Sequence, residues 1–449
     1  MSRFPRRNKL SLLTMAVAVA AVAAGAVGST GRGATSAVQV SLGTTTLRTA
    51  NYEQPTIQKV LQSLEKSFSA KHPNVKFNDL SLGANVGDYA TRMKLAMAGP
   101  AAPDVVQIGQ AQALMGPLVK AKLLRDLTGP AKQFGWASRF GPGLLDELKM
   151  RPDGKTFGSG SLYGVSLGGN MVGVYYNKAK LKALGFAGPP HTLAAFEQML
   201  SKATASGQVA LETGNLEKWP ALHYFYALAD VYCPIQQLRN WIYGDKGATI
   251  ALPCATAALN RLASWGAKGY IPSSANGTAY ADALTAFGKG TGVFMLTGSW
   301  AQAGFDQQAP GQIGFFLLPP LKAGQKPVAT GALTPPYGIS TKSKNPVAAA
   351  QWLDYLLTPN ASNKLAHVGV LPALKTSTFK PPKGTALADV YAGWQSVLNA
   401  NGLGLYFDWT TPKMLDVIDA PLQDIVAGKS DGISSLLQQM QQEWQSFHS

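Results

Sequence analysis

The sequence is poor in the residues that build metal and redox centres. Its 449 residues include two cysteines and five histidines, and the histidines stand far apart along the chain. Zinc sites need closely spaced Cys and His ligands. The common active-site motifs His-Glu-x-x-His and Cys-x-x-Cys do not occur either. We therefore expect neither a metal nor any other cofactor.

Acidic residues are scarce as well. The chain has 24 Asp and Glu residues against 40 Lys and Arg residues, which gives a formal net charge of +16. The basic residues are scattered, as at Lys178, Lys180 and Lys182, and form no dense run. Scattered charge is typical of a solvated surface rather than of a nucleic-acid-binding face, so we expect no nucleic-acid partner.

Long apolar runs are missing except near the start of the chain. Residues 10–27 are mostly Ala, Val and Leu, and they follow four basic residues, Arg3, Arg6, Arg7 and Lys9. Small residues after this run offer cleavage sites near Ala24 and Ala37. This layout predicts a signal peptide over residues 1–37, with a membrane anchor as the alternative and the export route, general or twin-arginine, left open. No cysteine lies near the cleavage region, so we expect a periplasmic or extracellular protein without a lipid anchor.

The two cysteines, Cys233 and Cys254, stand together in the middle of the chain. An exported protein matures in an oxidising compartment, where a pair of cysteines often bonds. We therefore expect a disulfide between Cys233 and Cys254, although two free thiols remain the alternative.

Strands and helices alternate along the chain. Extended apolar segments predict strands at 44–50, 75–80, 105–108, 173–176, 293–296 and 313–318. Apolar residues at helical spacing predict helices at 57–70, 89–98, 193–203, 346–357 and 433–447. Alternation of this kind predicts an α/β fold with parallel sheet. The length exceeds what one hydrophobic core usually organises, so two lobes are expected.

Six segments in order carry a family resemblance. They are residues 94–106, 118–127, 163–178, 292–300, 313–320 and 337–346. The most specific is 163–178, in which Tyr-Gly-Val leads to Val-Tyr-Tyr-Asn-Lys. Together they resemble the extracellular solute-binding proteins of ABC importers, in the carbohydrate-binding family that includes maltose-binding protein. The resemblance extends from about Thr44 to Gln445.

The resemblance implies a periplasmic-binding-protein fold, in which two lobes enclose a ligand cleft and are joined by crossing segments. It places the N-terminal lobe at 38–167 and 327–370, and the C-terminal lobe at 168–326 and 371–449. The crossings are then expected near Ser166–Asn170, Pro319–Lys326 and Val368–Lys375.

Aromatic and amide-bearing side chains at strand ends are the candidate ligand-binding residues. Sugars present apolar faces to rings and a rim of hydroxyls to Asp, Glu, Asn and Gln. The resemblance and the positions together suggest Trp300, Trp219, Tyr337 and Trp409 as stacking rings, and Glu53, Gln110, Asn170, Asn215 and Asp408 as polar contacts. Pro335 and Pro336 depart from the family, which often has paired glycines there.

The function that the resemblance implies is capture without catalysis. The chain would be the substrate-binding component of an ABC importer, a monomer that closes on a mono- or oligosaccharide and delivers it to a membrane permease. One alternative keeps the fold but binds a glycerol phosphodiester or another small polar solute. A second is a secreted glycoside hydrolase, which would need two carboxylates about 5–10 Å apart in the cleft.

Overall fold

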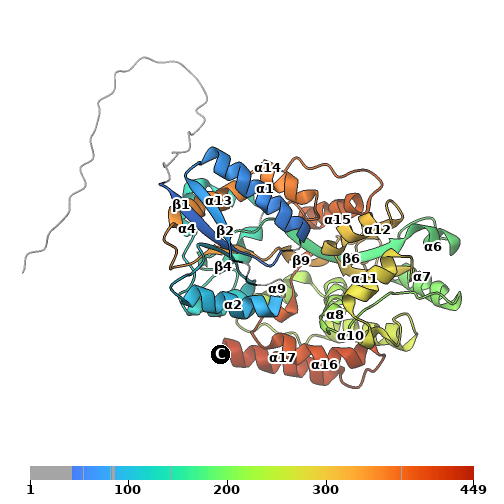
Figure 1. The fold of residues 1–449 in the computed structure, drawn as a ribbon. Helices are drawn as coiled ribbons and strands as arrows, with labels where there is room; N and C mark the ends of the chain where they lie inside the picture. Colours follow the sequence, from blue (N-terminus) through green and yellow to red (C-terminus); the bar gives the residue numbers. More distant parts are fainter. Residues whose placement is uncertain (1–42, 54, 81, 83–85, 142, 376) are drawn as a thin grey trace, which may run out of the picture. The chain divides into compact units, whose positions relative to one another are not determined.

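The computed structural model describes residues 43–53, 55–80, 82, 86–141, 143–375 and 377–449. The predicted signal peptide therefore lies outside the described residues. Within them, two β-sheets are each flanked by helices (Figure 1). We call the first sheet with its helices the first lobe and the second sheet with its helices the second lobe.

The first lobe is built on a four-stranded sheet in the order β10-β3-β1-β2. The strands are β1 (Thr45–Ala50), β2 (Val75–Asp79), β3 (Val105–Gln107) and β10 (Tyr337–Ile339). β1 pairs in parallel with β2 and β3, whereas β10 runs antiparallel to β3. The predicted parallel arrangement is thus found here, with one antiparallel edge strand contributed from far along the chain.

Helices lie on both sides of this sheet (Figure 1). On one side α1 (Pro55–Lys71) packs against α13 (Pro346–Leu356) and α14 (Pro359–Ala366). The ring of Phe68 in α1 meets Trp352 of α13 edge to face, with centroids 5.4 Å apart. α2 (Val86–Ala98) lies on the other side. These amphipathic helices bury the apolar faces that the sequence pattern indicated.

The second lobe has a five-stranded sheet centred on β6 (Gly169–Asn177). Its other strands are β7 (Phe294–Gly298), β8 (Ile313–Phe316), β9 (Ala329–Leu333) and β11 (Leu403–Gly404). β6 is antiparallel to β7, β8 and β9, whereas β11 is parallel to β9, so the sheet of this lobe is mixed and not the parallel sheet expected from helix and strand alternation. The reason is topological, because the chain enters the lobe along β6 and these neighbouring strands run back toward the first lobe.

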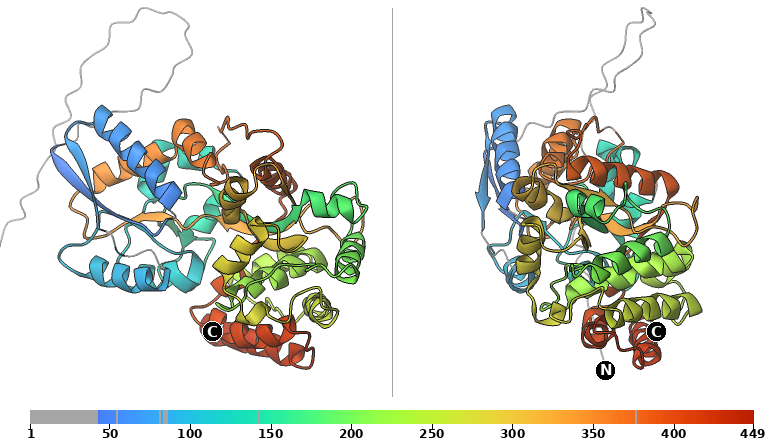
Figure 2. Two further views of the ribbon diagram at one scale, coloured as in Figure 1. Left: turned by 45° about the vertical axis from the view of Figure 1, so that its right-hand side comes forward. Right: turned by 90° about the vertical axis from the view of Figure 1, so that its right-hand side faces the viewer.

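Helices from the middle and the end of the chain pack together in the second lobe. α8 (Trp219–Tyr232) and α10 (Pro253–Ala267) pack against α16 (Met414–Val426) and α17 (Ile433–His448), as both views in Figure 2 show. The buried face of α17 consists of Ile433, Leu436, Leu437, Met440 and Trp444. This confirms the helix predicted at 433–447, and its apolar face is buried in the core.

Three chain segments connect the lobes. The first is 166–168, between Val165, which pairs with Tyr337 of the first sheet, and the start of β6. The second is 334–336, between β9 and β10. The third passes Leu371, which pairs with Gly169, and Leu374, which pairs with Phe140 of the first lobe.

The position of the second crossing corrects the sequence-based expectation. The Pro- and Lys-rich stretch 319–326 was expected to cross between the lobes, with the first lobe resuming at 327. Instead, 319–326 lies in the connection between β8 and β9, which are both paired with β6. Exposed turn residues mark a loop, but they do not distinguish a loop within one lobe from a crossing.

The predicted disulfide is present. Cys233 follows the last residue of α8, and Cys254 lies in the first turn of α10, with Cα atoms 5.3 Å apart. The bond closes a loop with a sequence separation of 21 residues. It therefore ties the end of one core helix to the start of the next.

Replacing both cysteines by serine should lower the free energy of unfolding by about 3 kcal/mol, since the bond restricts the unfolded chain over a loop of this length. Urea unfolding of the wild-type protein and the double variant would measure the difference. Dithiothreitol should destabilise the wild-type protein and leave the double variant unchanged. Equal stability of the two proteins under oxidising conditions would contradict the prediction.

Candidate functional site

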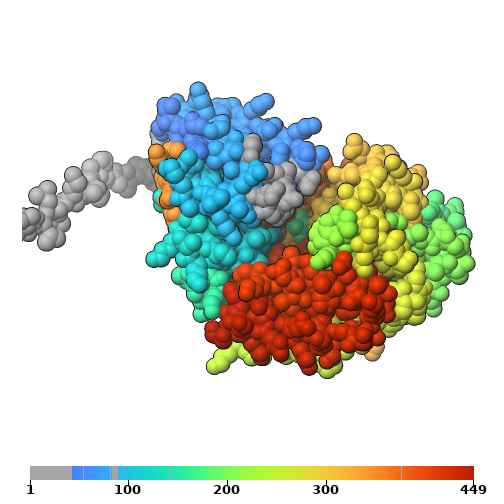
Figure 3. All heavy atoms as spheres, turned by 60° about the horizontal axis from the view of Figure 1, so that its bottom comes forward, coloured from blue at the N-terminus to red at the C-terminus, as the bar shows by residue number. Residues whose placement is uncertain are grey.

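A cleft of about 290 Å³ opens where the two lobes meet. Figure 3 shows the surface hollowed between the blue residues of the first lobe and the yellow residues of the second. The lining is Tyr52, Glu53, Thr56, Ile57, Gln107, Gly169, Asn170, Ser299, Trp300, Ala303, Thr334, Pro335, Val368, Gly369 and Val370. Both lobes contribute to this lining, together with the start of β6 next to the first crossing and residues of the second and third crossings, so a rotation of the lobes about the crossings would change its width.

On the first-lobe side, a hydrogen-bonded network centres on Glu53. Its Oε1 accepts hydrogen bonds from Gln107 Nε2 at 2.7 Å and from the Tyr337 hydroxyl at 3.2 Å. Gln107 Oε1 in turn accepts from the Tyr52 backbone N–H at 2.9 Å. Burial raises the pKa of Glu53 to about 7, although the bonds from Tyr337 and Gln107 oppose the shift. The carboxyl group is therefore held in one place and can titrate near neutral pH.

On the second-lobe side, the indole of Trp300 forms the wall. This side chain is 38% exposed, and its Nε1 donates to the Tyr280 hydroxyl at 2.8 Å. A Cβ atom at Gly298 would lie 2.1 Å from the Trp300 ring. Only glycine at position 298 allows the ring to occupy this place, so the Gly-Ser-Trp turn sets the orientation of the indole.

Further rings surround Trp300. Trp219 lies 4.5 Å from Tyr280, and Tyr406 lies 5.1 Å from Trp409, measured between ring centroids. The Tyr406 hydroxyl donates to Asn170 Oδ1 at 2.8 Å, which connects these rings to the first crossing. Trp409 itself is 7% exposed and also meets the ring of Phe157, with centroids 6.2 Å apart.

Three of the nine candidate residues, Glu53, Asn170 and Trp300, lie together on the cleft. Trp219 and Trp409 belong to the surrounding rings, and Tyr337 is buried behind Glu53. For these six residues a role in binding stays a prediction.

The other three candidates have their polar groups engaged elsewhere, and none of them lines this cleft. Gln110 Nε2 donates to the Leu333 carbonyl at 2.9 Å. Asn215 is fully buried, and its amide bonds the side chain of Asn276 and the backbone N–H of Ala221. Asp408 accepts from the Tyr226 hydroxyl at 3.1 Å, and burial raises its pKa to about 6. Asn215 thus holds the start of α8 through Ala221, and for all three residues a role in binding stays a prediction.

Sequence reasoning missed Gln107 and Tyr280. Gln107 is the last residue of β3. The residue predicted at the end of this strand was instead Gln110, three residues later. The alternation of side chains along the strand could have selected Gln107. Tyr280 begins a helix of the second lobe, α11 (Tyr280–Gly288), and nothing in its local sequence distinguishes it.

The described residues that line this cleft include one carboxyl group, that of Glu53, and neither Lys nor Arg. In the described part of the chain, no three His, Cys, Asp or Glu side chains are grouped so that they could hold a metal ion. The cleft thus offers rings and hydrogen-bonding groups, with little charge.

Comparison with known proteins places the chain in a family. Residues 64–389 match the family model of the bacterial extracellular solute-binding proteins. The chain belongs to this family. It is 26% identical over 353 residues to the multiple sugar-binding protein of Streptococcus mutans, covering 74% of this chain and 78% of that protein.

Solved structures share the fold of this solute-binding protein. A chitin oligosaccharide binding protein superposes with a TM-score of 0.75 at 19% identity, over 90% of this chain and 99% of that chain. A maltose-bound protein from T. maritima superposes with a TM-score of 0.68 at 17% identity, over 89% of this chain and 99% of that chain. The expected two-lobed α/β fold is therefore confirmed.

Within the described residues, no helix has both the length and the apolar character needed to cross a membrane.

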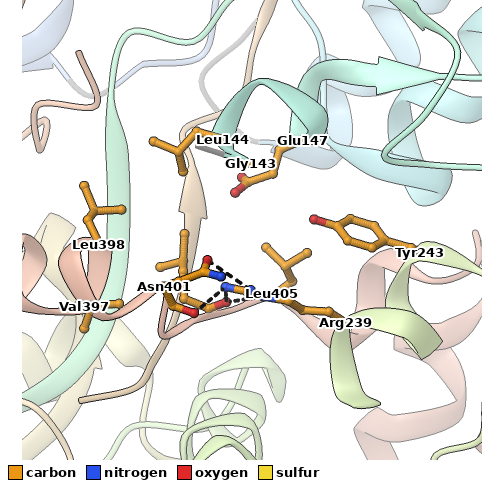
Figure 4. A pocket seen from close by; sticks show the side chains of 10 residues that line it. Gly143, Leu144, Glu147, Arg239, Tyr243, Val397, Leu398, Asn401 and Leu405 are labelled. Atoms are coloured by element: carbon orange, nitrogen blue, oxygen red, sulfur yellow. Dashed lines mark hydrogen bonds between the residues drawn. The ribbon is translucent and has the colours of Figure 1, made fainter. Parts of the chain in front are cut away.

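A second, smaller hollow lies behind the crossings (Figure 4). Glu147, from the 3₁₀-helix η2 (Leu144–Leu148) of the first lobe, faces Arg239 and Tyr243 of α9 (Ile235–Tyr243) across it. Glu147 Oε2 accepts from the Leu333 backbone N–H at 2.7 Å, at the end of β9. Arg239 donates through Nε to the Leu403 carbonyl at 2.8 Å. The first lobe thus contacts the second crossing through one buried carboxyl group.

Burial raises the pKa of Glu147 to about 8, although the hydrogen bond from the Leu333 N–H opposes part of this rise. In the unfolded chain the group titrates near pH 4.3. The protonated carboxyl group therefore contributes to the free energy of unfolding. This contribution is complete below that pH and is lost as the pH rises through about 8.

Glu147→Gln should therefore flatten the fall in thermal stability between pH 5 and pH 8, by an amount on the order of a few kcal/mol. Glutamine keeps the acceptor for Leu333 but does not ionise. Calorimetry at four pH values would measure the slope. Asp146→Asn is the matched control, because Asp146 pairs with Lys149 at the surface. Equal slopes for wild type and Glu147→Gln would show that Glu147 is already ionised at pH 5.

Proposed function

We propose that this solute-binding protein captures a neutral mono- or oligosaccharide in the cleft and releases it to the permease of an ABC importer. The lobes close on the sugar, and no bond is made or broken. The protein acts as an exported monomer, periplasmic or extracellular, after removal of residues 1–37, and carries no lipid anchor.

The observation that carries this proposal is the partly exposed Trp300 ring beside Glu53 and Asn170. An aromatic face covers the apolar face of a pyranose ring, while carboxylate and amide oxygens accept from its hydroxyls. Relatives named for the binding of multiple sugars and chitin oligosaccharide, and solved in complex with raffinose and maltose, support the same ligand class.

Both alternatives are less well supported. A phosphodiester ligand favours Arg, Lys or a helix N-terminus, and the described lining has no basic side chain. Glycoside hydrolysis uses two carboxyl groups, whereas the described lining contributes only that of Glu53.

Trp300→Ala should weaken sugar binding by about 30-fold, since truncating a central aromatic contact typically costs about 2 kcal/mol or more. A thermal-shift panel of maltose, raffinose, galactose and N,N′-diacetylchitobiose would identify a ligand, and calorimetric titration would measure the Kd. Leu415→Ala is the control, because Leu415 has the same exposed fraction, 38%, on α16. A thermal shift with glycerol phosphates but with no sugar would instead favour the first alternative.

A uronic acid version of the bound sugar should bind more weakly than the neutral sugar. The ratio of the two Kd values, which is the penalty for the ligand carboxylate, should grow between pH 5.5 and pH 8. Glu53 ionises near pH 7 and then repels the ligand carboxylate. Glu53→Gln should remove the pH dependence of the penalty, with the neutral sugar as the internal control. A penalty that is the same at both pH values would place the ligand carboxylate away from Glu53.

A further inference from the structure

His223 is a largely buried imidazole in the second lobe. It lies in the first turns of α8, and the side chain is 6% exposed. Its Nδ1 atom is buried and has no hydrogen-bond partner among the described residues. Buried polar groups in folded proteins are almost always paired, so an unpaired imidazole calls for an explanation.

The ring of His223 lies directly behind the wall of the cleft. Its centroid is 5.2 Å from Trp300, 5.3 Å from Trp219 and 6.2 Å from Tyr406. Trp300 lines the cleft, and Tyr406 donates to Asn170, which also lines it. The imidazole is therefore one ring away from the place where we propose that the sugar stacks.

The chemistry of this imidazole suits a hydroxyl. Burial lowers the pKa of His223 to about 3, so the ring is neutral at ordinary pH and carries one donor and one acceptor nitrogen. A hydroxyl group likewise donates and accepts. A cation or a metal is a poor fit, because no cluster of metal-ligating side chains is present among the described residues.

We propose that His223 is a ligand-binding residue, and that its imidazole exchanges a hydrogen bond with one hydroxyl of the sugar that stacks on Trp300. This inference rests on the proposed function and adds a determinant of specificity to it. Because the Trp300 ring covers the imidazole in the free protein, the indole would have to shift on binding, and the sugar would stack on it in that shifted position. In the described residues, the indole nitrogen has one hydrogen bond, to Tyr280. His223 then distinguishes sugars by the hydroxyl at one ring position.

The first measurement needs no ligand. His223→Phe keeps an aromatic ring among Trp219, Trp300 and Tyr406 but has no unpaired nitrogen. Its melting temperature without sugar should equal or exceed that of the wild type, because no hydrogen bond is lost. A clear decrease would indicate that the imidazole has a structural role, and it would overturn the inference.

The second measurement is the Kd for the sugar identified by the panel. His223→Phe should raise it at least tenfold, and His223→Asn should restore part of the affinity, because its amide can reach the position of Nδ1. His72→Phe is the control, since His72 packs on Phe68 in the first lobe with centroids 4.4 Å apart. An unchanged Kd in His223→Phe would overturn the inference and leave the proposed function intact.

Deoxy analogues of the same sugar identify the hydroxyl. In the wild type, one analogue should lose about tenfold in affinity, and in His223→Phe that analogue and the parent sugar should bind equally. A difference that persists in His223→Phe would assign the hydroxyl to another residue. If none of the sugars binds the wild type, the proposed function fails and this inference fails with it.

Discussion

The close approach of the three crossings at Gly168 and Gly169 is the constraint on which the cleft depends. A Cβ atom at Gly168 would lie 2.4 Å from the Leu371 carbonyl oxygen, and one at Gly169 would lie 2.3 Å from the Trp394 ring. Gly169 and Leu371 exchange two backbone hydrogen bonds, of 2.6 and 3.1 Å. A side chain at Gly168 would push the third crossing away from the first, and one at Gly169 would displace the Trp394 ring. The cleft is lined from all three segments because they can meet here.

Two buried carboxyl groups lie on opposite sides of this meeting point. Glu53 faces the cleft and is held by Gln107 and Tyr337, whereas Glu147 lies behind the crossings and bonds the backbone of Leu333. Neither forms a salt bridge in the described part of the chain. Because burial raises both pKa values, both groups titrate near neutral pH, one at the cleft and the other at the end of β9.

The sequence predicts the elements of this fold better than their connections. Helical spacing predicted 57–70 where α1 spans Pro55–Lys71, and 433–447 where α17 spans Ile433–His448. Local periodicity decides these elements because each buries one apolar face. The second crossing and the mixed second sheet depend on which strands pair across long separations, as β6 does with β9, and no local pattern encodes that pairing. Within the site, burial is likewise not readable from the sequence, because an exposed amide and a buried one such as Asn215 look alike.

The second-lobe wall shows how one small residue organises many large ones. Gly298 leaves room for the Trp300 ring, and that ring covers His223, so the imidazole is shielded by the residue that we expect to touch the sugar. An unpaired imidazole lowers the stability of the free protein. That cost is removed if a ligand hydroxyl pairs with it, and the same free energy then favours the bound state. On this view the wall is incomplete without its ligand, which is the property expected of a receptor that must distinguish one sugar from another and then release it.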